Sequence, residues 1–102
     1  MANFVRVATT AELEPGQCKV VVAEGRQVAL FNVGGVFHAL DNTCLHRGGP
    51  LGEGQLEGQI VTCPWHAWTY DVTTGICPAN PNISVKTYHV KIEGSDIEVA
   101  IW

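Results

Sequence analysis

Two short runs of the sequence each combine one cysteine with one histidine. A single residue separates Cys44 from His46, two residues separate Cys63 from His66, and residues 47–62 lie between the runs. Thiolate and imidazole bind soft and borderline metals, and four such side chains complete a coordination set. The spacing therefore predicts a metal centre held by Cys44, His46, Cys63 and His66. Residues 44–46 are called the first ligand run below, and residues 63–66 the second.

The composition of the two runs indicates which kind of centre this is. Structural zinc sites usually pair cysteine with cysteine and histidine with histidine along the chain, whereas each run here offers one sulfur and one nitrogen. That arrangement suits a binuclear centre in which one metal takes both cysteines and the other takes both histidines. A mononuclear Cys2His2 zinc site remains an alternative, because zinc accepts the same ligand types.

The region from Asn42 to Asn82 has the composition expected of loops that enclose such a centre. It contains six glycines and four prolines: Gly48, Gly49, Gly52, Gly54, Gly58 and Gly75, with Pro50, Pro64, Pro78 and Pro81. Glycine allows backbone N–H groups to approach a ligand closely, and proline stiffens a loop. We therefore expect residues 42–82 to form a metal-binding subdomain of loops and short strands.

The remaining sequence predicts the β-scaffold that must position these loops. Alternating and β-branched residues predict strands, whereas no segment shows sustained helical periodicity. Strands are expected at residues 4–7, 18–23, 26–33, 36–40, 60–62, 68–71, 85–93 and 96–101, with one helical turn at 9–13. The prediction is a single all-β domain over residues 1–102, a small antiparallel barrel or sandwich into which the subdomain is inserted.

Composition and charge exclude several classes of function. A net charge of −4 gives no electrostatic support for binding nucleic acid or an anionic membrane. No apolar stretch reaches the roughly 18 residues that a membrane helix needs, and no secretory leader is visible. Four cysteines could form two disulfides, but two of them lie in the ligand runs, so a reducing cytoplasm is the better expectation. Cys18 is expected to be a small core residue, and the role of Cys77 stays open.

The two runs with their neighbours, residues 44–49 and 63–70, resemble the cluster loops of Rieske ferredoxins that serve bacterial ring-hydroxylating oxygenases. Residues 76–82 resemble the proline-containing third loop that covers the cluster in that family. The resemblance extends over the whole chain. It implies one [2Fe–2S] cluster, with Cys44 and Cys63 on one iron and His46 and His66 on the other.

The resemblance also implies a function. The chain would be a monomeric one-electron carrier and not an enzyme itself. It would take electrons from an NADH-dependent flavoprotein reductase and pass them to a terminal oxygenase. The alternatives are a carrier for a di-iron hydroxylase, a small subunit like that of nitrite reductase, and, in another class, a zinc-stabilised interaction module or a cluster-based sensor.

Four further positions bear on the redox potential. In high-potential respiratory relatives a disulfide joins the cluster loops, and its positions correspond here to Gly49 and Trp65. Those relatives also place a serine where this chain has Trp68, whereas Tyr70 keeps a hydroxyl that could bond a cysteine sulfur. Fewer donors to sulfur disfavour the reduced cluster, so a potential near the low end of the Rieske span, about −150 mV, is expected.

The resemblance places the two imidazoles at an exposed tip of the molecule. Around them we expect an apolar collar formed by Leu45, Pro64, Trp65, Pro78 and Pro81. A small contact surface of this kind suits brief encounters between an electron carrier and its partners. Trp68, by contrast, is expected to pack in the core.

Overall fold

The computed structural model describes residues 4–42, 50–65 and 68–100. These residues form a β-protein in which only two single turns are helical. In chain order the elements are β1 (Phe4–Thr9), η1 (Thr10–Glu12), β2 (Cys18–Ala23), β3 (Arg26–Val33), β4 (Val36–Asp41), η2 (Leu51–Glu53), β5 (Gln55–Glu57), β6 (Ile60–Thr62), β7 (Thr69–Asp71), β8 (Ile76–Cys77), β9 (Asn80–Ser84), β10 (Thr87–Tyr88), β11 (Val90–Glu93) and β12 (Asp96–Ala100). The all-β, antiparallel fold predicted from the sequence is confirmed. No helix in this described part of the chain is long and apolar enough to cross a membrane.

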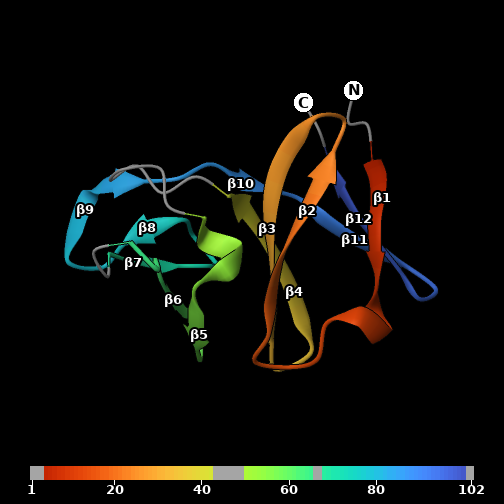
Figure 1. Cartoon of the computed structure of the whole chain (residues 1–102), viewed down its shortest axis with the longest axis horizontal. Coiled ribbons are helices and arrows are strands. Elements are labelled where there is room, and N and C mark those ends of the chain that lie inside the picture. The colour runs from red at the N-terminus through yellow and green to blue at the C-terminus, as the bar shows by residue number, and fades with distance from the viewer. Residues whose placement is uncertain (1–3, 43–49, 66–67, 101–102) are drawn as a thin grey trace.

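Two antiparallel sheets make the scaffold, which occupies one half of the molecule (Figure 1). One sheet has the order β1-β12-β11, so that it joins the first described strand to the last, and the other has the order β10-β4-β3-β2. The predicted strands at 18–23 and 26–33 are found with the same bounds. The left-handed residues Glu24 and Gly25 make the tight turn between them.

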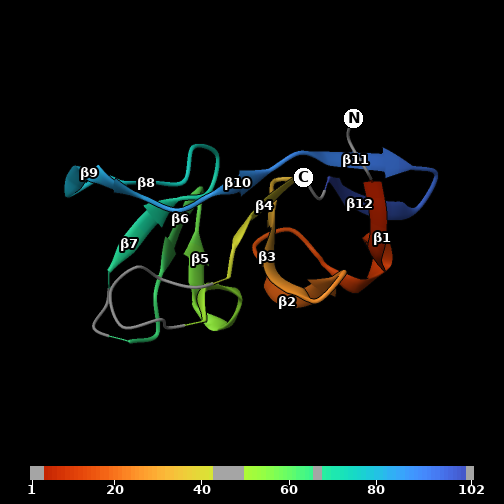
Figure 2. The ribbon, with the colours of Figure 1, turned by 90° about the horizontal axis from the view of Figure 1, so that it is seen from above.

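Two small sheets, with the orders β5-β6-β7 and β8-β9, make the other half, where the sequence predicts the metal-binding subdomain (Figures 1 and 2). The second ligand run begins directly after β6, and β7 follows the run and pairs with β6 again. This hairpin therefore fixes the two ends of the second run. Strands β5, β8 and β9 had no counterpart among the predicted elements, because β5 and β9 are short and mostly polar and β8 has only two residues.

Strand β3 separates two hydrophobic cores because both of its faces are buried. Val28 and Leu30 point to one side, Ala29 and Phe31 to the other, and all four have no exposed surface. One face belongs to the scaffold core: Ala8, Leu13, Val21, Ala23, Val28, Leu30, Ala39, Tyr88, Ile97 and Val99. The other belongs to the shared core: Ala29, Phe31, Leu40, Leu51, Val61, Cys63, Tyr70, Val72, Cys77 and Val85. The shared core joins the subdomain to the scaffold and contains one of the predicted ligands.

The segment 85–93 differs from the prediction of one continuous strand. It is broken at His89 into β10, which pairs with β4, and β11, which pairs with β12. Tyr88 faces Ala39 in one sheet and Val90 faces Val99 in the other, so the chain changes sheets between them. Local alternation continues through such a crossing, and this is why the sequence pattern did not reveal it.

The helical turn η1 is closed by a capping box that involves Glu12. The Glu12 carboxylate accepts hydrogen bonds from the Thr9 N–H at 2.9 Å and the Thr9 hydroxyl at 3.0 Å, and from Lys19 Nζ at 3.0 Å. The hydrogen bond from Lys19, followed by those from Thr9, lowers the pKa of Glu12 from 4.5 to about 2. Because the folded-state pKa is depressed, the contribution of Glu12 to stability is present above pH 4.5 and is lost as the pH falls through about 2.

We therefore expect Lys19→Met to raise the pKa of Glu12 toward its ordinary value, because the substitution removes the strongest of these interactions. The measurement is an NMR titration of the side-chain carboxyl carbons of both proteins. A Glu12 that titrates at its ordinary value in the wild-type protein would contradict this description of the turn.

Gly54, at the end of η2, lies too close to β6 to carry a side chain. A Cβ atom on Gly54 would lie 2.2 Å from the Thr62 carbonyl oxygen and 3.2 Å from that of Leu51. We expect Gly54→Ala to destabilise the fold by about 2–3 kcal/mol, because the backbone must shift to relieve the overlap. The matched control is Gly58→Ala in the β5–β6 turn, where φ is +59° but no atom lies within 4 Å, and about 1–2 kcal/mol is expected. Thermal unfolding should show a larger loss of stability for Gly54→Ala than for Gly58→Ala. Equal losses of stability would show that the backbone of β6 can shift away at little cost.

Candidate metal centre

Cys63 is the predicted ligand that the structure describes. It lies immediately after β6 and is only 1% exposed, with its side chain in the shared core. Its backbone N–H donates to the Trp68 carbonyl at 2.7 Å, and its Sγ accepts the Trp65 N–H at 3.4 Å. The first bond joins the start of the second run to the residue just after it, Trp68, and the second directs a backbone donor at the sulfur.

The environment of Cys63 fits a thiolate ligand of an iron–sulfur cluster. Hydrogen bonds from backbone N–H groups to the ligand sulfurs are one of the means by which proteins tune such clusters, and Trp65 already supplies one. The thiol is buried on its inner side by Val61, Tyr70 and the other members of the shared core. The chemistry of this position therefore agrees with the predicted role.

Cys44, His46 and His66 lie outside the described residues, as do Leu45 and Gly49. Within the described ranges no group of three or more histidine, cysteine, aspartate or glutamate side chains could hold a metal. The set of four ligands therefore stays a prediction from the sequence.

The stems of the first ligand run are fixed by hydrogen bonds around Asn42. The Asn42 carbonyl accepts the Leu51 N–H at 2.7 Å, and the Asn42 side-chain oxygen accepts the Gly52 N–H at 2.8 Å. These bonds join the residues on either side of the segment 43–49. The sequence did not identify Asn42 or Gly52 as a residue that supports the centre. The position of Asn42, two residues before the predicted ligand Cys44, could have suggested such a role.

The third predicted loop lies beside the second ligand run. Residues Ile76–Ser84 form the β8–β9 hairpin, and its base is fixed by the Val85 N–H, which donates to the Gly75 carbonyl at 2.9 Å. A cavity of about 260 Å³ separates this hairpin from the run; it is lined by Trp68, Thr69, Cys77, Ala79, Asn80 and Ile83. The expected neighbourhood of residues 76–82 and the second run is therefore present in the fold.

The turn that leads into this hairpin depends on Asp71. Its carboxylate accepts hydrogen bonds from the Thr73 N–H at 2.9 Å, the Thr73 hydroxyl at 2.6 Å and Gln59 Nε2 at 2.7 Å. Burial alone would raise the pKa of Asp71, but the hydrogen bonds from Thr73 and Gln59 together outweigh it and lower the pKa. Asp71 is thus an ionised structural residue that holds the turn after β7 and joins it to Gln59, which precedes β6.

Trp65 in the second run and Trp68 just after it have different environments. Trp65 is 50% exposed, one of the most exposed large apolar residues in the described part of the chain, and so agrees with a place on the predicted collar. Trp68 is half-buried against the shared core, as expected. Tyr70 is fully buried in that core, close to Cys63 in the fold. Pro64, Pro78 and Pro81 are exposed.

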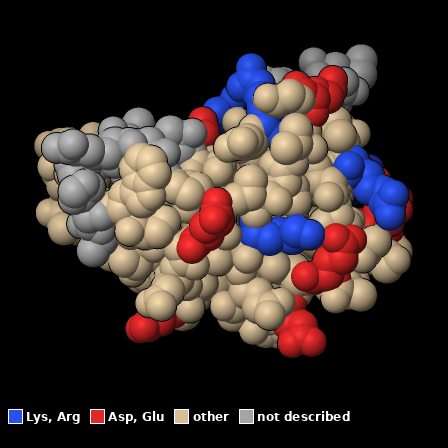
Figure 3. All heavy atoms as spheres, viewed as in Figure 1, with Lys and Arg blue, Asp and Glu red and all other residues tan. Residues whose placement is uncertain are grey.

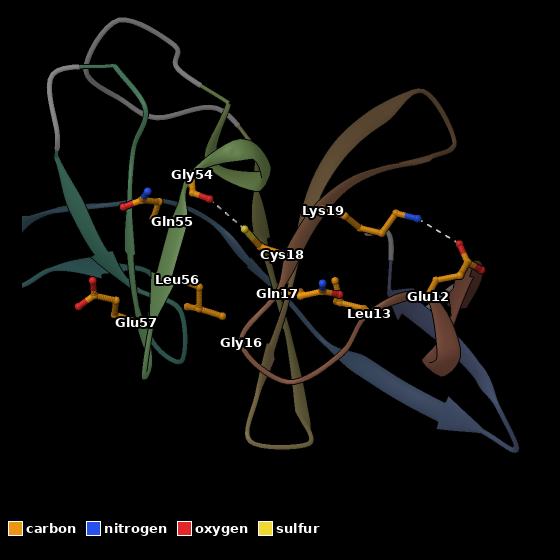
Figure 4. Close-up of a pocket in the computed structure, with 10 residues that line it drawn as sticks. All are labelled: Glu12, Leu13, Gly16, Gln17, Cys18, Lys19, Gly54, Gln55, Leu56 and Glu57. Atoms are coloured by element: carbon orange, nitrogen blue, oxygen red, sulfur yellow. Dashed lines mark hydrogen bonds and ion pairs between the residues drawn. The ribbon is translucent and has the colours of Figure 1, made fainter.

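The two cysteines outside the ligand runs are free thiols. Cys77 is 5% exposed and belongs to the shared core, whereas Cys18 is half-buried beside it. The Cys18 thiol donates a hydrogen bond to the Gly54 carbonyl at 3.3 Å, across the boundary between β2 and the subdomain (Figure 4). Burial raises the pKa of the Cys18 thiol, so it stays protonated and can act as this donor. The prediction of a small core residue therefore missed a contact that links the two halves.

Comparison with known proteins gives relatives that match this chain over nearly its whole length. It is 41% identical to the ferredoxin component of the naphthalene 1,2-dioxygenase system of Pseudomonas aeruginosa over 100 residues, which cover 95% of this chain and 94% of the relative. Among solved structures, it is similar to the ferredoxin of carbazole 1,9a-dioxygenase from Nocardioides aromaticivorans IC177. That similarity has a TM-score of 0.89 at 33% identity and covers 96% of this chain and 97% of the other.

A third similarity is to a chain in the complex of reduced oxygenase and oxidized ferredoxin in carbazole 1,9a-dioxygenase. The TM-score is 0.87 at 28% identity, with 95% of this chain and 92% of that chain covered. The family model of the Rieske [2Fe-2S] domain matches residues 3–89, which include both ligand runs and the third loop. This match shows that the chain belongs to the Rieske family, whose cofactor is a single [2Fe–2S] cluster, and the buried Cys63 agrees with it.

Proposed function

We propose that this chain is a one-electron carrier that delivers electrons to a terminal ring-hydroxylating oxygenase and performs no catalysis of its own. The observation that carries the proposal is the match, at 41% identity over nearly the whole of both chains, to a protein named as the ferredoxin component of a dioxygenase system. The similarity to a chain in an oxygenase–ferredoxin complex supports the same acceptor class. The NADH-dependent flavoprotein reductase is the donor that we propose, and the cytoplasm is the proposed location.

We further propose Cys44, His46, Cys63 and His66 as the ligands. The cluster, when bound, accepts and releases one electron. Cys63 holds its sulfur buried and hydrogen-bonded on the scaffold side, and the Trp65 N–H donates to that sulfur. Histidine ligation of the second iron would give the Rieske type of centre.

The surface near the ligand runs is suited to a transient partner. Trp65 is half-exposed there, and Pro81 on the third loop is exposed. The described residues 50–65 and 68–85 carry three carboxylates, Glu53, Glu57 and Asp71, and no lysine or arginine. In the view of Figure 3 the lysine and arginine side chains gather over the scaffold half. An apolar patch with acidic surroundings fits an acceptor whose docking site is apolar with a basic rim.

The direct test of the acceptor class is stopped-flow mixing of the reduced protein with an oxidised Rieske oxygenase from an aromatic-degradation system of the source cell. We expect second-order oxidation of the protein whose rate falls as the ionic strength rises, because the charge complementarity is screened. A di-iron hydroxylase that is reduced faster than every ring-hydroxylating oxygenase would overturn the proposal. Such a result would change the proposed acceptor class but not the proposed cluster, because the cluster spectrum does not depend on the acceptor.

A further inference from the structure

Two polar side chains, Asn32 and Asn42, are buried in the described part of the chain, with 3% and 2% exposure. A buried carboxamide is costly unless both of its ends are hydrogen-bonded. Asn32 donates to the Leu13 carbonyl at 2.8 Å and accepts the Gly35 N–H at 2.8 Å. It therefore fixes the hairpin at the far end of β3, away from the ligand runs.

Asn42 makes the corresponding pair of bonds at the ligand end of the scaffold. Its Nδ2 donates to Gln27 Oε1 at 3.2 Å, and its Oδ1 accepts the Gly52 N–H at 2.8 Å. Its backbone is held as well, since its N–H donates to the Gln27 carbonyl at 3.3 Å and its carbonyl accepts the Leu51 N–H at 2.7 Å. One residue thus binds β3 on one side and the returning stem of the first ligand run on the other.

The returning stem cannot shift to compensate for a change at Asn42. Leu51 is fully buried in the shared core. A Cβ atom on Gly52 would lie 2.6 Å from the Val20 side chain and 2.9 Å from the Lys19 carbonyl group, so the backbone of Gly52 is pressed against β2. The Gly52 N–H is consequently a fixed donor to which Asn42 must conform.

We propose that Asn42 is a positioning residue for the cluster, acting through Cys44, which follows two residues later, and His46. The inference rests on the proposed ligand set. By joining Asn42 to the rigid Gly52, the carboxamide fixes the two points at which the segment that carries Cys44 and His46 begins and ends. The orientation of ligands and the hydrogen bonds around them govern the spectrum and the potential of such centres.

The test compares Asn42→Leu with Asn32→Leu, both as iron-loaded proteins. Each substitution keeps the branched shape of the side chain and removes the partner of one buried backbone group. Asn42→Leu leaves the Gly52 N–H without its acceptor, and Asn32→Leu leaves the Leu13 carbonyl without its donor, each at a cost of about 1–3 kcal/mol. For Asn42→Leu we expect altered EPR g values, an altered midpoint potential and, below the unfolding temperature, iron loss to a chelator about tenfold faster than in the wild-type protein. For Asn32→Leu we expect a comparable loss of thermal stability but wild-type g values and potential.

The inference is overturned if Asn42→Leu has the g values and potential of the wild-type protein and loses iron no faster than Asn32→Leu. Should Asn42→Leu fail to fold, Gln27→Leu decides the matter, because Gln27 is exposed and its substitution removes the acceptor of Asn42 Nδ2, so that the Gly52 N–H alone holds the carboxamide. A shift of the g values in that variant supports the inference, and wild-type values reject it. All of these measurements use the isolated protein, so they do not depend on whether the proposed oxygenase is the electron acceptor. A wild-type protein without histidine-ligated iron would reject both the ligand set and this inference.

Discussion

Cys63→Ser is expected to abolish the cluster, leaving a colourless protein without sulfide and with iron below one tenth of the wild-type content. The reason is that Cys63 supplies a thiolate, the ligand type that holds iron in these centres, and a serine hydroxyl stays protonated at neutral pH. The scaffold does not depend on this sulfur for its sheets. Visible absorption with iron and sulfide analysis of the purified variant gives the measurement, and far-UV circular dichroism reports whether the β-fold persists.

The chain supplies two matched controls for this substitution. Cys77 is buried in the same shared core as Cys63, and Cys18 packs against that core, but neither is in a ligand run. Cys77→Ser and Cys18→Ser should both retain a full complement of iron and the wild-type spectrum, with at most a modest loss of stability from the buried hydroxyl. If Cys77→Ser lost the cluster while Cys63→Ser kept it, the proposed ligand set would be wrong.

Trp65→Ser is expected to slow electron transfer to the oxygenase by roughly tenfold or more while leaving the cluster spectrum unchanged. Trp65 is 50% exposed next to the second ligand run, and exposed tryptophans at the centre of small interfaces often contribute more than 1 kcal/mol to association. The substitution keeps the backbone N–H that donates to the Cys63 sulfur, so the centre itself should not change. Stopped-flow rates measured against protein concentration separate weaker association from slower transfer within the complex.

Ile92→Ser provides the control for this second prediction. Ile92 is 43% exposed on β11, in the scaffold, and β11 belongs to the sheet farthest from the subdomain (Figure 2). Removal of an apolar side chain with similar exposure there should leave the transfer rate at the wild-type value. Equal effects from both substitutions, or none from Trp65→Ser, would place the docking face somewhere other than the second ligand run.

The sequence predicts the scaffold well because its strands obey simple patterns. The strands at 18–23 and 26–33 are bounded by a turn that requires left-handed residues, and their bounds are reproduced. The pattern fails where a strand changes sheets, as at His89, because the alternation of side chains there stays intact while the hydrogen-bonding partner changes. It also fails for β5, β8 and β9, because these strands have only three, two and five residues and are too short for a clear alternation of side chains.

The type of metal centre could be predicted from the sequence, but the contacts that hold the ligand runs in place could not. Spacing and residue type identify the four ligand candidates, and the family match agrees with the cofactor that they imply. The contacts that hold the runs in place, such as Asn42 with Gly52 and Cys18 with Gly54, join residues 10 and 36 positions apart. No local pattern encodes such pairs, so they become visible only in the folded chain.

The most direct test of the account is a potentiometric titration of the purified protein followed by EPR. In the reduced state we expect one unpaired spin per two irons and nitrogen couplings from two histidine ligands. The one-electron transition should have a midpoint potential below 0 mV, at about −150 mV. A reduced cluster without nitrogen couplings, or a midpoint in the respiratory range near about +300 mV, would contradict a low-potential Rieske carrier in this chain.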